Sequence, residues 1–243
     1  TASDDSSAAV VVTASDGEDT AAQQFTWTAT NTDPVLTVTA AGTACDPTLS
    51  GSYSDAGTAD THMGTIDWGD GSTDDAFSTS PFGSLGHAYT SAGDYTVTVG
   101  VADDDGGTDS ETIEHTVYNL PSAVRQPINA TGTRSVFKAG STIPVKITVV
   151  DCAGAAVSTL TPTVGLTRVD STTLESSNES AVTVVATNGK QMRWDTTGQQ
   201  YIYNLSSKLS QHTGAALGAG TYKLTVDDAS FASSVTAYFD LKK

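Results

Sequence analysis

Basic residues are scarce in this sequence. Only 11 of the 243 residues are Lys or Arg, against 28 Asp or Glu, and the formal net charge is −17. Such a surface repels the phosphates of nucleic acids and anionic lipids, which excludes nucleic acid as a partner. The acidity is typical of a chain that attracts divalent cations, or of a secreted chain that stays soluble, and it also fits a salt-loving host.

Long apolar runs are also absent. No segment approaches the roughly 18 consecutive apolar residues that cross a membrane, so no membrane insertion is expected. The first ten residues, TASDDSSAAV, have neither the basic start nor the apolar centre of a signal peptide. We therefore expect that any export signal has already been removed.

Cysteine is limited to Cys45 and Cys152. A disulfide between them would require close contact between two domains, because they lie far apart in the sequence. Neither has the spacing of a metal-binding knuckle or a redox pair. The sequence favours two buried thiols and leaves a disulfide open.

The abundant residues indicate the fold class. Thr, Ser, Val, Gly and Ala dominate, whereas Leu and Glu are few, a bias that favours strands and tight turns. In one stretch, Tyr95, Val97, Val99 and Val101 alternate with small or polar residues, the period of a half-buried strand. The sequence predicts an all-β chain of tandem Ig-like β-sandwiches.

A repeated hairpin pattern predicts the domain boundaries. An alternating strand, an Asp-rich turn and a second strand recur at 10–30, 92–117 and 219–241. A recurring closing hairpin is typical of a string of sandwich domains. The predicted domains are 1–33, the final hairpin of an incomplete domain that resembles an Ig or cadherin-like repeat, then complete sandwiches at 34–119 and 120–243.

The stretch TIDWGDGST at 65–73 combines strand and turn signals. Trp68 alternates with Ile66 as an inward-facing residue, so we expect it in a core and not on a binding surface. Asp70 begins a turn, and both Asp67 and Asp70 are expected to accept hydrogen bonds from turn amides.

About residues 35–119, which include this stretch, closely resemble a PKD domain. The resemblance rests on Trp68, Gly69, Asp70, Gly71, His87, Tyr89, Gly93, Tyr95 and Val97. It implies an Ig-like β-sandwich of the kind found in extracellular and cell-surface proteins.

The third region carries a second resemblance, to the PxKF-type modules of secreted bacterial proteins, over about residues 120–243. The name-giving motif reads Pro144, Val145, Lys146, Ile147, with Ile in place of the usual Phe. The substitution keeps an apolar residue that should face inward. This resemblance implies an Ig-like fold and no established chemistry.

Calcium is the one cofactor that the sequence supports. Calcium takes six to eight oxygen ligands, which Asp side chains on adjacent loops supply. The PKD resemblance implies a calcium site where the domain linker, an early loop and the closing hairpin converge. The matching residues are Asp33, Asp55, Asp60, Asp103, Asp104 and Asp105. The alternative is a solvated acidic surface, and Asp16, Glu18 and Asp19 form a weaker analogue in the first hairpin.

No enzyme is predicted, because the sequence has no nucleophile elbow, zinc-binding helix motif or phosphate-binding glycine loop. Lys146 suggests one covalent alternative, an isopeptide crosslink to Asp240. A lysine packed at a strand edge is the simpler interpretation.

The predicted function is a non-enzymatic adhesion, stalk or assembly segment at the C-terminus of a larger secreted or surface protein of a bacterium, stiffened by calcium. Its partners would be other protein chains or an extracellular polymer. One alternative is an accessory substrate-binding or spacer region of a secreted hydrolase. Another is a strand-sharing homo-oligomer through residues 1–33, since Phe25 and Trp27 lie on one face of a hairpin with two unpaired edges.

Overall fold

The computed structural model describes residues 6–57, 59–175, 190–208 and 216–243. The described residues form strands and connecting turns without a helix, and none of them makes a helix long and apolar enough to span a bilayer. The chain divides into two compact units, Thr1–Tyr89 with Asp94–Thr116, and Thr90–Gly93 with Val117–Lys243. The predicted fold class is confirmed: the chain is all-β, with tandem Ig-like β-sandwiches.

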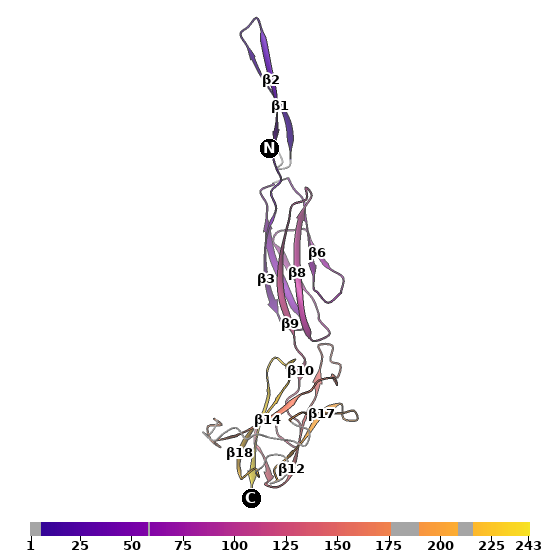
Figure 1. Cartoon of the computed structure of the whole chain (residues 1–243), viewed down its shortest axis with the longest axis vertical. Coiled ribbons are helices and arrows are strands. Elements are labelled where there is room, and N and C mark those ends of the chain that lie inside the picture. The colour runs from indigo at the N-terminus through magenta and orange to yellow at the C-terminus, as the bar shows by residue number, and fades with distance from the viewer. Residues whose placement is uncertain (1–5, 58, 176–189, 209–215) are drawn as a thin grey trace. The chain divides into compact units, whose positions relative to one another are not determined.

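The first hairpin is a two-stranded antiparallel sheet of β1 (Ser7–Ser15) and β2 (Thr20–Thr28) (Figure 1). Its turn contains Gly17, whose φ of +102° favours glycine. Val10 pairs with Phe25 and Ala8 with Trp27, so one face of the hairpin is apolar. Phe25 and Trp27 remain 49% and 47% exposed.

The second region is a sandwich of two antiparallel sheets (Figure 1). Alternate residues of each strand face the space between the sheets, and Val97, Val99 and Val101 are all buried, as their alternation predicts. One sheet has the order β3-β4-β7, with β3 at Val35–Gly42, β4 at Pro47–Ser54 and β7 at Phe82–Gly86. The other has the order β6-β5-β8-β9, with β5 at His62–Asp67, β6 at Asp75–Phe77, β8 at Gly93–Asp103 and β9 at Thr108–Val117.

The turn after β5 is built around a buried indole. Trp68 is 1% exposed, and its Nε1 donates a hydrogen bond of 2.8 Å to Asp75 Oδ2. The Tyr89 hydroxyl donates to the Trp68 carbonyl oxygen over 2.7 Å, and the His87 ring stacks on the indole with centroids 4.9 Å apart. The predicted role of Trp68 as a core residue is confirmed.

The aspartates of this turn satisfy polar groups of the fold. Asp67 accepts from the Gly69 amide at 2.8 Å and Asp70 from the Ser72 amide at 3.0 Å, as predicted. Gly69 has a φ of +76°, and a side chain there would collide with the Thr96 carbonyl of β8. The glycine is thus required by the close approach of the neighbouring strand.

The second unit contains a larger sandwich. One sheet has the order β11-β19-β18-β14 and the other β12-β17-β16. Val145 and Ile147 of the PxKF-like motif are both 0% exposed, so the predicted inward position of Ile147 is confirmed. The strands are β10 (Leu120–Pro121), β11 (Ser135–Lys138), β12 (Thr142–Ile147), β13 (Val149–Val150), β14 (Thr163–Val169), β16 (Arg193–Asp195), β17 (Gln200–Ser206), β18 (Gly220–Asp227) and β19 (Val235–Lys242).

One expectation about covalent chemistry is wrong, and one alternative is excluded. Both Cys45 and Cys152 are disulfide-bonded, so neither is the buried thiol that the sequence favoured. The Lys146–Asp240 crosslink is excluded because the two residues lie on the outer faces of different sheets, as the burial of their neighbours Ile147 and Leu241 shows. The Asp240 carboxylate instead accepts from Thr221 Oγ1 at 2.7 Å and pairs with Arg134 Nε at 3.3 Å.

Candidate metal centre

Two connections of the PKD-like sandwich meet at one end of its four-stranded sheet. The loop before β5 carries Asp55 and Asp60, and the turn after β8 carries Asp104 and Asp105. They meet because β5 and β8 pair antiparallel, with His62 opposite Asp103. The Thr61 amide donates a hydrogen bond of 2.7 Å to Asp104 Oδ1 and joins the loop to the turn.

Five of the six predicted ligands form two overlapping groups of carboxylates. In each group, one oxygen of every member lies within 4.8 Å of the others. The first group contains Asp55, Asp60 and Asp103, and the second contains Asp60, Asp104 and Asp105. Carboxylates at this separation repel one another, and a divalent cation between them would remove the repulsion.

Asp103 is the best-supported carboxylate of the cluster. It is 9% exposed, and its Oδ1 accepts from the amides of Gly107 at 2.7 Å and Asp105 at 3.0 Å. The side-chain amide of Asn31 donates to Asp103 Oδ2 over 3.0 Å. The Asn31 amide, followed by the backbone donors, lowers the pKa of Asp103 below its ordinary value, so the group is anionic at neutral pH.

Asp55 is held in place by partners within its own loop. Its Oδ1 accepts from the Gly57 amide at 3.0 Å, and its Oδ2 lies 2.9 Å from His62 Nε2. Burial raises the pKa of Asp55, but the Gly57 amide and the His62 ring outweigh it and leave the pKa below its ordinary value. His62 therefore orients a carboxylate of the cluster.

Asn31 is a residue of the centre that the sequence analysis missed. It lies in the linker between β2 and β3, and its Oδ1 is buried without a hydrogen-bond partner among the described residues. A buried amide oxygen without a donor costs about 1–3 kcal/mol. An amide oxygen is also a calcium ligand, so this atom fits a cation beside Asp103. The only sequence feature that could have indicated Asn31 is its position two residues before the predicted ligand Asp33.

Asp33 approaches the same place from the linker. A Cβ built on Gly107 would lie 2.9 Å from Asp33 Oδ1 and 2.8 Å from Asn31 Nδ2, and closer still to Asp103 Oδ2. The three side chains therefore converge over a position that only glycine leaves open. The structure thus brings Asp33 to the edge of the cluster without placing it in either carboxylate group.

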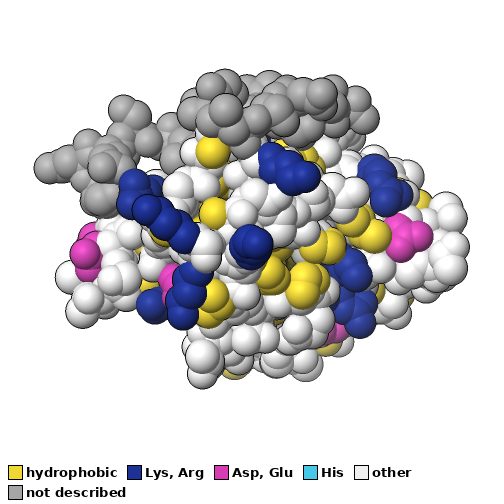
Figure 2. Space-filling model, turned by 90° about the horizontal axis from the view of Figure 1, so that it is seen from below, with side chains coloured by type: hydrophobic (Ala, Val, Ile, Leu, Met, Phe, Trp, Pro, Cys, Tyr) yellow, Lys and Arg dark blue, Asp and Glu magenta, His cyan; other side chains and the backbone are white. Residues whose placement is uncertain are grey.

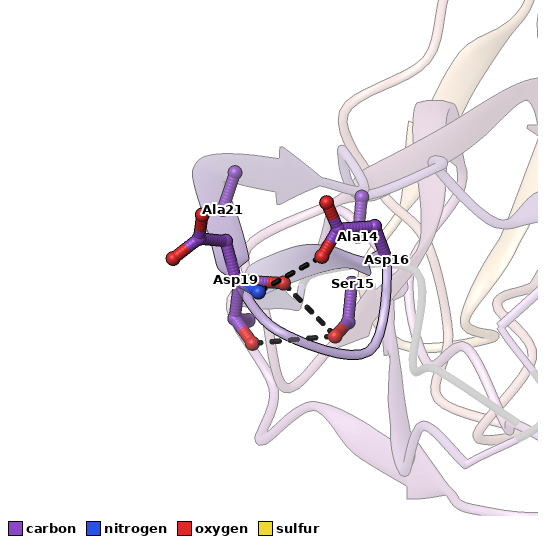
Figure 3. Close-up of a pocket in the computed structure, with 6 residues that line it drawn as sticks. Ala14, Ser15, Asp16, Asp19 and Ala21 are labelled. Atoms are coloured by element: carbon purple, nitrogen blue, oxygen red, sulfur yellow. Dashed lines mark hydrogen bonds between the residues drawn. The ribbon is translucent and has the colours of Figure 1, made fainter.

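The acids of the first hairpin, which the sequence offered as a weaker calcium site, are arranged differently (Figure 3). Asp16 Oδ1 accepts from the amides of Asp19 at 2.8 Å and Glu18 at 3.1 Å, and Ser15 Oγ donates to the Asp19 carbonyl oxygen at 3.0 Å. The Asp19 and Glu18 amides lower the pKa of Asp16. Asp16 acts as a turn cap, and these acids form no metal-binding group among the described residues.

The donor set at the sandwich end consists of oxygen atoms. Carboxylates and an amide oxygen are the ligands that calcium prefers, while the described part of the cluster offers no thiol. The residues present therefore fit calcium better than zinc or copper.

Comparison with known proteins identifies the middle region. The family model described as "PKD domain" matches residues 31–117. The PKD1 domain from the Vibrio cholerae metalloprotease PrtV is 23% identical, with coverage of 35% of this chain and 98% of that chain and a TM-score of 0.30. The PKD1 domain of Vibrio anguillarum Epp is 24% identical, with coverage of 36% and 95% and a TM-score of 0.30.

A third solved structure, the Escherichia coli adhesin FdeC, is 14% identical, with coverage of 97% of this chain and 74% of that chain and a TM-score of 0.31. No curated protein matches the chain. The family match agrees with the buried Trp68 turn and with the strand that carries Tyr95, Val97 and Val99. Residues 31–117 of this chain belong to the PKD domain family.

Proposed function

We propose that the chain is a non-enzymatic extracellular spacer and adhesion segment whose first linker is stiffened by calcium. A PKD domain fits an extracellular domain role without catalysis. The observation that carries the proposal is the orphaned Oδ1 of Asn31 beside Asp103. A calcium ion bound there would tie the linker to the loop before β5 and to the turn after β8.

The ion would act by restricting the linker. Residues 29–34 connect β2 to β3, and the Asn31–Asp103 hydrogen bond joins this linker to the sandwich. Ligands from the linker and from the sandwich would hold the linker against the sandwich and remove much of its freedom to bend. A stiff linker keeps a distal binding surface away from the surface that carries it.

Isothermal titration of the calcium-free chain tests the site. We expect one binding event, lost in D103N and kept in D74N. Asp74 is an exposed aspartate of the Trp68 turn, so the two variants remove the same charge. Because D103N also removes a hydrogen-bond acceptor, N31A is the second variant, and it should weaken binding without any change in charge. Equal binding by all four proteins would reject the site in favour of a solvated acidic surface.

Small-angle X-ray scattering tests the stiffening. With calcium, we expect a narrower distribution of end-to-end distances for the wild type than with a chelator, and no such difference for D103N. If calcium binds but the distribution stays the same, the ion stabilises the loops and the spacer role loses its support.

An accessory role in a secreted hydrolase is the second candidate. It requires a surface that retains an insoluble polymer, so cosedimentation with collagen and with chitin is the decisive measurement. Retention of the folded chain on either polymer, lost after heat unfolding, would favour this role over the spacer. Full recovery of the chain in the supernatant would reject the accessory role.

Strand sharing through the first hairpin stays a proposal. Its support is the apolar face of β1 and β2, where Phe25 and Trp27 are about half exposed and both outer edges are unpaired within the described chain. The partner would be the same hairpin of a second copy. An F25S/W27S variant should lose this association, and unchanged association would reject it.

A further inference from the structure

The charges of this chain are divided between its two units. All 11 Lys and Arg residues lie in residues 117–243, together with 8 of the 28 acids. Residues 1–116 hold the other 20 acids and contain no Lys or Arg. The first unit is thus strongly anionic, while the second carries a small positive excess despite the net charge of −17.

Three lysines of the second unit gather at one end of its four-stranded sheet. The parallel pairing of β11 with β19 sets Lys138 opposite Lys242, and the Ala139 amide donates to the Lys242 carbonyl oxygen at 2.7 Å. Gly140 follows, and a Cβ built there would lie 3.9 Å from Lys208 Cγ. The three residues are exposed, and we name them the lysine end.

No acid within the described residues neutralises this cluster. None of the three lysines forms an ion pair with a described residue, and the nearby Asp240 pairs with Arg134. The acids Asp170 and Glu175 follow β14, which lies at the opposite edge of the sheet from β11. Figure 2 is viewed from the end that carries the C-terminus and shows Lys and Arg side chains spread among hydrophobic ones, with fewer acids.

Like charges held together repel one another, and an anionic partner would relieve that repulsion. The chain itself contains a matching surface, because the first unit has 20 acids and no Lys or Arg. Contact between a basic and an acidic surface steers association and fixes its orientation.

We propose that the lysine end binds the acidic first unit of a second copy of this chain, in a head-to-tail contact. The two contacting surfaces differ, so a pair of copies keeps one free acidic unit on one copy and one free lysine end on the other, and the assembly can grow. This contact lies beyond the spacer role and needs neither calcium nor the hairpin.

Sedimentation velocity of the full chain over rising protein concentration tests the proposal, in a chelator to keep calcium out. At about 10 mM salt, where charges act over roughly 30 Å, we expect the average mass to rise without stopping at a dimer. At about 0.5 M salt the association should disappear. Strand sharing through the hairpin would persist at high salt, so this pair of conditions separates the two contacts.

The variant K138E/K208E/K242E should weaken self-association at least tenfold. The matched control K146E/R193E/K223E makes the same change in charge on residues of the sheets away from the lysine end, and it should retain more of the association. Thermal melting establishes that both variants are folded, and K138Q/K208Q/K242Q replaces the first if it is not.

Mixing provides the sharpest readout, because the lysine-end variant keeps its acidic unit. It should not bind itself, yet it should bind labelled wild-type chain and stop its growth. A monomer at every concentration in low salt overturns the proposal, as does equal weakening by both triple variants. Binding of a soluble acidic polysaccharide at the lysine end without self-association also overturns it and assigns the surface to that polymer.

Discussion

Two aspartate-rich regions of the PKD domain use the same side chain differently. In the Trp68 turn, Asp75 accepts from the indole and Asp70 Oδ2 lies 2.8 Å from His87 Nε2. At the other region, Asp55, Asp60 and Asp103 bring their carboxylates within 4.8 Å of one another, beside a buried amide oxygen without a donor. In the first region the side chains satisfy one another, whereas the second keeps three carboxylates close together beside an amide oxygen without a donor among the described residues.

The difference shows that local sequence does not separate a structural aspartate from a ligand. Asp67 and Asp70 flank Gly69, and Asp103 to Asp105 precede Gly106, so both regions read as Asp-Gly turns. What separates them is whether the carboxylates crowd against one another, which depends on how distant segments meet. A turn whose acids are satisfied stabilises the fold, and a turn whose acids crowd together favours a cation.

The largest effect is expected from replacing Trp68, the buried centre of the first region. Trp68→Ala should lower the free energy of unfolding by about 3–5 kcal/mol, because it opens a cavity and leaves Asp75 without its indole donor. Urea denaturation followed by circular dichroism measures it, with Met63→Ala, at a 68% exposed position, as the control. A loss below about 1 kcal/mol would mean that Trp68 does not organise this turn.

A smaller effect is expected where the linker meets the acidic cluster. Gly107→Ala should cost about 1–3 kcal/mol, since the new methyl group must displace Asn31, Asp33 or Asp103. It should also weaken calcium binding, whereas Gly83→Ala, at an open position, should change neither. Urea denaturation and calcium titration measure both effects. If Gly107→Ala is destabilised but keeps its calcium affinity, Gly107 has no role in the proposed metal site.

Much of the fold could be predicted from the sequence. The alternation through Val97, Val99 and Val101 identifies a half-buried strand, and the Trp68 stretch identifies a PKD turn, because both are local patterns. The five grouped carboxylates were also predicted, but through the PKD resemblance and not from their spacing.

The rest depends on contacts between distant segments. Asn31 reads as an ordinary linker residue until its amide is seen beside Asp103, 72 positions away. The lysine end is hidden for the same reason: Lys138 and Lys242 meet through a parallel pairing of strands that no local pattern encodes. The disulfide state of the cysteines likewise follows from tertiary structure.

Low pH should destabilise the Trp68 turn, because it protonates Asp70. The Ser72 hydroxyl and amide and the His87 ring lower the pKa of Asp70 from 3.8 to about 2 despite its partial burial. A lowered pKa in the fold contributes stability that is present above pH 3.8 and lost as the pH falls toward 2. The wild type should therefore exceed D70N in melting temperature at pH 5, and the difference should shrink between pH 4 and pH 2. A constant difference across this range would contradict the assignment, and D74N is the matched control.

The smallest effect is expected at the first hairpin, whose apolar face is half exposed. Phe25→Ser should change the free energy of unfolding by less than about 0.5 kcal/mol in dilute solution, because the ring is 49% exposed and fills no core. The comparison is Phe77→Ser, since Phe77 is 8% exposed and stacks on Phe82 with centroids 4.1 Å apart. Replacing that ring should cost about 3–5 kcal/mol. Urea denaturation at several protein concentrations measures both. A large loss for Phe25→Ser that grows with concentration would mean that a second chain covers this face, as strand sharing requires.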